Sequence, residues 1–158
     1  MTELTPGAPA PDFRLPDAGG RPVALGDFAG GKLIVFFYPA AMTPGCTVEA
    51  VDFTAGNADF LKAGYSVVGI SPDKPEVLAK FIARNDLDLT LLSDPEKTVI
   101  AAYGAWGERN LYGKVVTGVL RSTFVIDVDA AGHGTITDAQ YRVRATGHVK
   151  RLRDGLGV

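Results

Sequence analysis

The sequence is poor in cysteine: its 158 residues include one, Cys46. A single cysteine excludes an intramolecular disulfide framework, and a secreted domain of this size more often carries paired cysteines. We therefore expect a reducing, cytoplasmic environment. His133 and His148 have no local partner at metal-ligand spacing, and together with one cysteine they predict no metal site.

The chain also lacks an uninterrupted apolar run of about 18 residues, so we expect no membrane span. Its opening, Met-Thr-Glu-Leu-Thr-Pro, has neither the cationic start nor the apolar segment of a signal peptide. The net charge of -2 is too small to indicate a nucleic acid or an anionic membrane as partner. Lys150, Arg151 and Arg153 form a short basic stretch at the end of an expected helix, where cations complement the helix dipole.

What is present fits one globular domain covering residues 1–158, with 46% hydrophobic and 22% charged residues. Three apolar runs predict strands buried on both faces. They cover Leu33–Tyr38, Tyr65–Ile70 and Thr123–Val128. Phe13–Leu15 and Val23–Leu25 flank a glycine-rich turn and predict an N-terminal hairpin.

Helical spacing alternates with these strands. Val48, Val51, Ala55, Ala58 and Leu61 form an apolar stripe that we expect to face the core, and the helix should close at Gly64. Further helices are expected over Pro75–Ala83, Glu96–Tyr103 and Thr146–Leu156, while Gly107–Gly118 is expected to be a polar loop. The pattern predicts an α/β domain with a mixed central sheet flanked by helices, and it leaves flavodoxin-like and thioredoxin-like arrangements open.

The segment around Cys46 contains the residues best suited to catalysis. It joins a central strand to a helix, where α/β sheets usually place their sites. Thr43 is a suitable N-cap and Pro44 a suitable first helical residue, which places Cys46 at the third helical position. The free N–H groups of that turn stabilise a thiolate, the nucleophilic form of cysteine. Glu49, one turn later, would repel the thiolate, so we expect a basic partner from elsewhere in the chain.

The motif Pro39-x-x-x-Thr43-x-x-Cys46 resembles the active-site signature of peroxiredoxins, and the surrounding residues resemble the bacterioferritin-comigratory-protein (PrxQ) branch. Similar segments recur in order along the chain: Ala10–Phe13, Gly69–Asp73, Leu92–Pro95, Tyr103–Gly107 and Arg121–Asp127. The resemblance implies a thioredoxin-like fold of the peroxiredoxin variant with an N-terminal β-hairpin. It also implies a cofactor-free peroxidase that acts in antioxidant defence.

Roles follow from the resemblance at matching positions. Cys46 is implied to be the peroxide-attacking nucleophile, and Thr43 and Arg121 are implied to be catalytic with it. Pro39 and the N–H groups of Gly45 and Cys46 are implied to line the substrate site. Glu49 would orient Arg121, which then supplies the expected cation.

One departure from the family pattern changes the expected cycle. Many members of this branch carry a resolving cysteine five residues after the nucleophile, where this chain has Val51. We expect Val51 to point away from Cys46 into the apolar stripe. The oxidised cysteine must then be resolved by thioredoxin, glutaredoxin, a low-molecular-weight thiol or Cys46 of a second chain.

Two other functions remain open at this point. The same cysteine could serve a slow-turnover redox sensor or a chaperone-like protein, or it could be inert in a plain binding domain. We expect a monomer, with a weak homodimer as the alternative.

Overall fold

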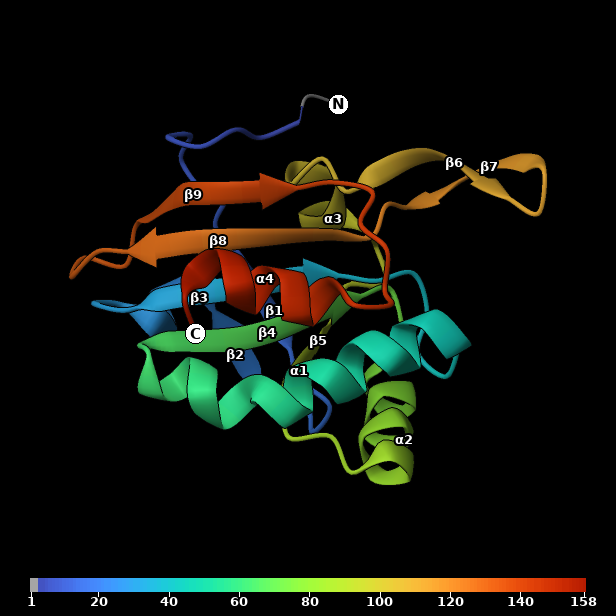
Figure 1. Ribbon diagram of the computed structural model, residues 1–158, viewed down its shortest axis with the longest axis horizontal. Helices are drawn as coiled ribbons and strands as arrows, with labels where there is room; N and C mark the ends of the chain where they lie inside the picture. The colour runs from blue at the N-terminus through green and yellow to red at the C-terminus, as the bar shows by residue number, and fades with distance from the viewer. Residues whose placement is uncertain (1–2) are drawn as a thin grey trace.

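The computed structural model describes residues 3–158, and a five-stranded mixed sheet forms its centre (Figure 1). The strands lie in the order β5-β4-β3-β8-β9. The first three are parallel to one another, and β8 and β9 run antiparallel to their neighbours. Their bounds are β3 (Lys32–Phe37), β4 (Tyr65–Ser71), β5 (Thr90–Ser93), β8 (Ser122–Val128) and β9 (Gly134–Gln140). The predicted mixed α/β fold is confirmed.

Apolar layers cover both faces of this sheet because successive side chains of a strand point to opposite sides. Ile34 and Phe36 of β3 face a layer built from the helices α1 (Pro44–Lys62), α2 (Pro75–Asn85) and α4 (His148–Leu156). Leu33, Val35 and Phe37 belong to the opposite layer, which includes α3 (Thr98–Ala102). Within residues 3–158, no helix is long and apolar enough to cross a membrane.

The N-terminal hairpin is present as predicted. Strand β1 (Arg14–Pro16) pairs antiparallel with β2 (Pro22–Ala24), and a 3-10 turn, η1 (Leu25–Phe28), follows. Asp17 closes the turn because its Oδ1 accepts hydrogen bonds from the N–H groups of Gly19 and Arg21, each at 2.9 Å. The hairpin places Phe13 and Leu25 against the sheet.

The predicted loop over Gly107–Gly118 is wrong. The segment forms a second hairpin, β6 (Trp106–Leu111) and β7 (Lys114–Val119), which projects from the body of the fold (Figure 1). Its turn residues Tyr112 and Gly113 both have positive φ, 51° and 81°, as a tight two-residue hairpin turn requires. Because much of the hairpin is solvated, its strands lack the apolar alternation that sequence analysis relies on.

The predicted core stripe of α1 is also wrong. Val48 and Val51 are 40% and 41% exposed, and Ala55, Ala58 and Leu61 are exposed as well. The face that meets the sheet is the one with the larger side chains: the ring of Phe53 stacks on that of Phe36 with centroids 4.4 Å apart. The buried residues of this face are Cys46, Glu49, Ala50, Phe53, Gly56 and Phe60. A buried glutamate interrupts this face, so its apolar pattern is weaker than that of the exposed face.

Candidate active site

The site lies where β3 passes into α1, as the sequence predicts. Helix α1 begins at Pro44 with Thr43 at the N-cap position, so Cys46 is the third helical residue. Residues of the first helical turn have no carbonyl four positions earlier in the helix to accept their N–H groups. The amides of Gly45 and Cys46 therefore remain available to a ligand, and the positive end of the helix dipole lies beside the thiol.

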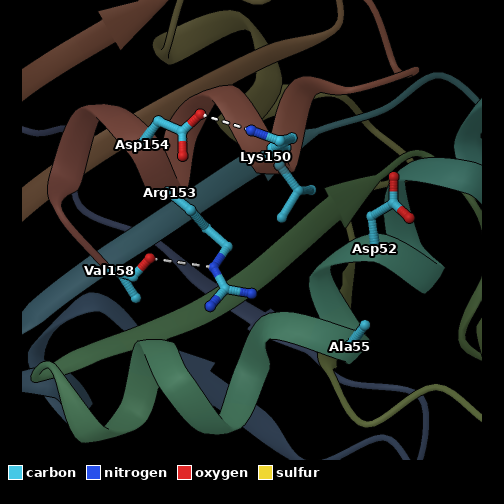
Figure 2. A pocket seen from close by; sticks show the side chains of 7 residues that line it. Asp52, Ala55, Lys150, Arg153, Asp154 and Val158 are labelled. Carbon is cyan, nitrogen blue, oxygen red and sulfur yellow. Dashed lines mark hydrogen bonds and ion pairs between the residues drawn. The ribbon is translucent and has the colours of Figure 1, made fainter.

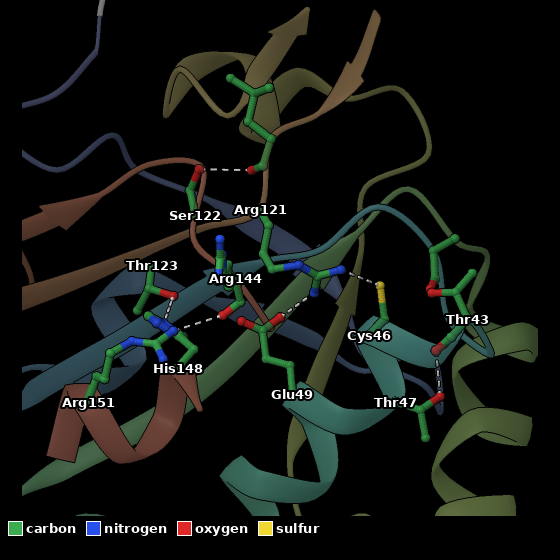
Figure 3. Close-up of polar contacts among 12 residues, drawn as sticks. Thr43, Cys46, Thr47, Glu49, Arg121, Ser122, Thr123, Arg144, His148 and Arg151 are labelled. Carbon is green, nitrogen blue, oxygen red and sulfur yellow. Dashed lines mark hydrogen bonds and ion pairs between the residues drawn. The ribbon is translucent and has the colours of Figure 1, made fainter. Parts of the chain in front are cut away.

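Cys46 is 1% exposed and packs on the core face of α1, together with Ala50 and Phe53. Its Sγ accepts a hydrogen bond from Nη2 of Arg121 at 3.3 Å. Figure 3 shows the Arg121 guanidinium reaching the sulfur from the strand side of the site. The cysteine thus combines the burial of a core residue with a direct contact to a cation.

Glu49 holds the other end of the same guanidinium. Nη1 of Arg121 lies 2.7 Å from Oε1 of Glu49, whose side chain is fully buried. Burial raises the pKa of the Glu49 carboxyl to about 7, and the charge of Arg121 opposes the rise only in part. Burial alone would lower the pKa of Arg121, but Cys46 and Glu49 outweigh it and raise that pKa. The structure thus brings together the three residues that the sequence analysis grouped.

The backbone around Arg121 fixes the position of its side chain. The carbonyl of Arg121 accepts a hydrogen bond from the N–H of Val143 at 2.9 Å, which ties it to the segment after β9. Gly45 lets the guanidinium approach the helix closely: a Cβ added there would lie 3.2 Å from Nη2 of Arg121. A glycine before Cys46 is therefore favoured by the space that the arginine occupies.

Thr43 is beside the site, but its hydroxyl does not make the side-chain cap that the sequence suggests. It donates a hydrogen bond to the carbonyl of Ala40 at 2.7 Å. In this position the hydroxyl oxygen keeps its lone pairs for an incoming proton donor. Pro39 is half-buried two residues after the end of β3, and its predicted place against the substrate stays a prediction.

Sequence reasoning gave no role to Asp73, which holds the loop in front of α1. Its Oδ2 accepts hydrogen bonds from the N–H of Ala41 at 2.7 Å and from the hydroxyl of Ser71 at 2.8 Å. The hydroxyl of Ser93 in turn donates to the carbonyl of Asp73. The only available signal was that Asp73 lies in one of the segments with family resemblance.

A hollow of about 390 Å³ between α1 and α4 is distinct from this site. Its lining includes Asp52, Lys150, Arg153 and Asp154 (Figure 2). Lys150 pairs with Asp154 at 3.1 Å, and Arg153 pairs with Asp59 at 2.6 Å. These two pairs neutralise both cations of the hollow, as expected for a solvated helix–helix groove.

Known proteins resemble the chain over nearly its whole length. The model of the AhpC/TSA family matches residues 6–131. A putative peroxiredoxin of Mycobacterium tuberculosis is 57% identical over 157 residues, which cover 99% of this chain and 98% of the relative. Peroxiredoxin Bcp of Escherichia coli is 46% identical over 129 residues, covering 82% and 83% of the two chains.

Solved structures agree with the sequence matches. A peroxiredoxin Q mutant of Xanthomonas campestris superposes with a TM-score of 0.83 at 33% identity, covering 99% of this chain and 96% of the other. BcpB of Mycobacterium tuberculosis superposes with a TM-score of 0.82 at 37% identity, covering 98% and 97%. The expected thioredoxin-like fold of the peroxiredoxin variant is thereby confirmed. The chain belongs to the AhpC/TSA family and is a peroxiredoxin of the Bcp/PrxQ branch, a thiol-dependent peroxidase.

Proposed function

We propose that this peroxiredoxin reduces hydrogen peroxide and organic hydroperoxides with Cys46 as its nucleophile, and that a thiol from outside the chain completes the cycle. One observation carries the proposal: the Arg121 guanidinium contacts both the sulfur of Cys46 and the carboxylate of Glu49. An inert core cysteine has no need of a cation at hydrogen-bond distance. Here the cation stabilises the thiolate, the form that attacks.

In the first half of the cycle, the thiolate attacks one oxygen of the O–O bond. A sulfur–oxygen bond forms, the O–O bond breaks, and the departing oxygen takes the electron pair and a proton to leave as water or an alcohol. The product on the protein is a sulfenic acid at Cys46. No cofactor is required, because the peroxide itself is the oxidant.

Charge moves during this step from the sulfur to the departing oxygen. Arg121 and the N–H groups of Gly45 and Cys46 would lie along that path as donors already in place, and such preorganised donors lower the barrier. The lone pairs of Thr43 Oγ1 would accept a hydrogen bond from the O–H of the bound hydroperoxide. Pro39 would shield the sulfur from water, and Glu49 would orient Arg121 from behind.

In the second half of the cycle, the oxidised sulfur needs a partner that this chain does not carry. Val51 stands where many relatives have the resolving cysteine, and no other cysteine is present in the sequence. A thiol of thioredoxin, glutaredoxin or a small molecule would therefore attack the sulfenic acid, release water and leave a mixed disulfide. A second thiol then restores Cys46, and the protein works as a monomer in antioxidant defence.

The test is rapid mixing of the reduced protein with hydrogen peroxide, followed by mass spectrometry. We expect one oxygen atom to be added at Cys46, much faster than free cysteine reacts, and to be removed when a thiol is supplied. The Cys46→Ser variant is the control that should take up no oxygen. A rate equal to that of free cysteine would contradict the proposed nucleophile.

The absence of a built-in resolving cysteine also fits a redox sensor with slow turnover. The two functions differ in the second half of the cycle alone. Sustained peroxide loss in the presence of thioredoxin, glutaredoxin or a small thiol supports the peroxidase. Oxidation without turnover under all three supports the sensor.

A further inference from the structure

A second hollow, of about 300 Å³, is lined in part by Arg121 and by residues of the projecting β6–β7 hairpin. Its volume is at the lower end of the range for small-molecule sites. Three of its lining residues are arginines and none is acidic. The lining consists of Arg109, Asn110, Leu120, Arg121, Arg142 and Val143.

Two of the three arginines that line this hollow carry a positive charge that no acidic side chain of the described part of the chain neutralises, whereas Arg121 is paired with Glu49. Among residues 3–158, neither Arg109 nor Arg142 forms an ion pair, and the buried Nε of Arg109 has no hydrogen-bond partner. Arg142 donates from Nη1 to the backbone carbonyl of Glu108 at 2.6 Å, which satisfies a donor without neutralising the charge. The exposed side chain of Glu108 points away from that of Arg109, because neighbouring side chains of a strand alternate.

Separate elements hold these arginines in a fixed relation. Arg109 belongs to β6, where its Nε lies close to Gly118 of the paired strand β7: a Cβ added to Gly118 would be 3.7 Å away. The hydrogen bond from Val143 to the carbonyl of Arg121 joins the segment of Arg142 to the residue that contacts Cys46. The hollow is therefore built around the catalytic arginine and is not a surface cluster elsewhere.

We propose that this hollow binds the carboxylate of the small thiol that resolves oxidised Cys46. The inference rests on the proposed function, which requires such a thiol from outside. Arginine pairs with a carboxylate through two parallel hydrogen bonds, and arginines without an anion are prepared to receive one. Because Arg121 lines the hollow and also contacts Sγ of Cys46, a carboxylate beside Arg109 and Arg142 would place a thiol on a short chain near the sulfur.

The step that follows is balanced. The thiolate of the bound molecule attacks the sulfur of the sulfenic acid, a sulfur–sulfur bond forms, and the oxygen leaves as water after taking up a proton. The carboxylate takes no part in bond making. The carboxylate holds the thiol near the sulfur of oxidised Cys46. A neutral thiol of equal length is not held there and should therefore react more slowly.

The experiment compares 3-mercaptopropionate with 3-mercaptopropan-1-ol in single-turnover reduction of protein that has first been oxidised at Cys46. Rates are expressed per thiolate, so that a difference in thiolate fraction between the two thiols does not contribute. We expect the carboxylate to react about tenfold faster, the factor that one charge-assisted contact supplies. The preference should fall in the Arg109→Gln and Arg142→Gln variants and persist in Arg14→Gln, which removes an exposed arginine outside the hollow.

Binding is measured separately, by following the Arg109 Nε–H resonance of the Cys46→Ser protein during titration with 3-mercaptopropionate. A saturable shift that the alcohol does not cause supports the site, even if the protein proves to be a sensor. Equal rates for the two thiols, or a carboxylate preference that both hollow variants retain, would overturn the inference and leave the peroxidase function standing. If neither thiol reduces the oxidised protein, the proposed use of a small thiol fails. A preference for carboxylate-bearing peroxides in the oxidation step would instead assign the hollow to the other substrate and overturn the thiol site.

Discussion

Nη1 of Arg121 lies 2.7 Å from Oε1 of the fully buried Glu49, and the same guanidinium reaches Sγ of Cys46 through Nη2 at 3.3 Å. One cation thus serves two acidic groups that are one helical turn apart. Glu49 fixes the orientation of the guanidinium, and in doing so it competes with the sulfur for the positive charge. We therefore expect the reactivity of Cys46 to depend on the planar shape of arginine as well as on its charge.

Replacing Arg121 tests this dependence directly. In Arg121→Lys the positive charge remains, but an ammonium group cannot make two separated contacts in one plane. We expect oxidation of Cys46 by hydrogen peroxide to slow by about 10²-fold in Arg121→Lys, and by more in Arg121→Gln, because a preorganised donor is lost. Stopped-flow measurement at neutral pH checks this, with the exposed Arg14→Gln as a control that should react at the wild-type rate. A wild-type rate in Arg121→Gln would refute the assigned role.

The raised pKa of Glu49 predicts how stability depends on pH. Burial brings this pKa from its ordinary value of 4.5 to about 7. At pH values between these two, Glu49 keeps its proton in the folded protein and has released it in the unfolded chain. The contribution of Glu49 to the free energy of unfolding must therefore fall as pH rises from about 4.5 to about 7, and it is constant above that range. Glu49→Gln removes the titration, so the stability of the wild type relative to the variant should decline over this window.

Urea unfolding of both proteins at several pH values measures that difference. The loss is expected to be a few kcal/mol at most, since one unit of pKa corresponds to about 1.4 kcal/mol. Glutamine keeps an oxygen that can accept from Nη1 of Arg121, which limits other disturbances. A difference curve that is flat between pH 4.5 and 7 would show that Glu49 does not change its protonation there.

Asp73 should be a positioning residue. In Asp73→Ala the N–H of Ala41 loses its acceptor, and the loop leading to Thr43 loses its link to β4. We expect about 1–3 kcal/mol lower stability, the cost of a polar group left unpaired, and slower oxidation of Cys46 because the first turn of α1 is less fixed. Asp73→Asn keeps one accepting oxygen and should restore most of the rate.

The exposed Asp88→Ala is the matched control. An Asp73→Ala protein that is less stable but oxidises normally would assign Asp73 a structural role only.

The parts of the fold that the sequence predicts well are those with strong local signals. The apolar run through Leu33 and Phe36 predicts β3, and Thr43-Pro44 predicts the first residue of α1. Cys46, Glu49 and Arg121 are grouped on two grounds: a glutamate beside a thiolate requires a cation, and the family resemblance identifies Arg121 as that cation. Local sequence patterns cannot group them, because Arg121 is 75 residues distant from Cys46. No local pattern contains that contact.

The two errors have different physical origins. On α1 the exposed face carries Val48 and Val51, while the buried face carries the polar Glu49, which Arg121 satisfies from another element. Apolar periodicity predicts that the less polar face of a helix is buried. On α1 the buried ion pair of Glu49 and Arg121 makes the buried face the more polar one, so the predicted faces are exchanged. The β6–β7 hairpin was missed because its turn chemistry at Tyr112-Gly113 is the main signal, and it lies between strands with little apolar content.

The exposure of Val51 leads to the last prediction, which concerns the missing resolving cysteine. Positions 46 and 51 are separated by about 7.5 Å of rise along α1, beyond the Cα distance of about 6.8 Å at which disulfides normally close. In Val51→Cys the two sulfurs can therefore join only if the first turns of α1 unwind.

We expect the peroxide-treated Val51→Cys protein to lose two hydrogens by mass and to exchange backbone amides of residues 44–51 faster than the reduced form does. The change costs no core packing, because Val51 is exposed. Ala55→Cys places a thiol on the same exposed face but nine residues from Cys46, so its sulfenic acid should persist until an external thiol is added. The introduced thiols at positions 51 and 55 differ in their distance from Cys46. A sulfenic acid that persists in Val51→Cys would mean that the first turns of α1 stay helical after oxidation. An internal disulfide would instead show that a single side chain decides whether this peroxiredoxin depends on another molecule for its second half-reaction.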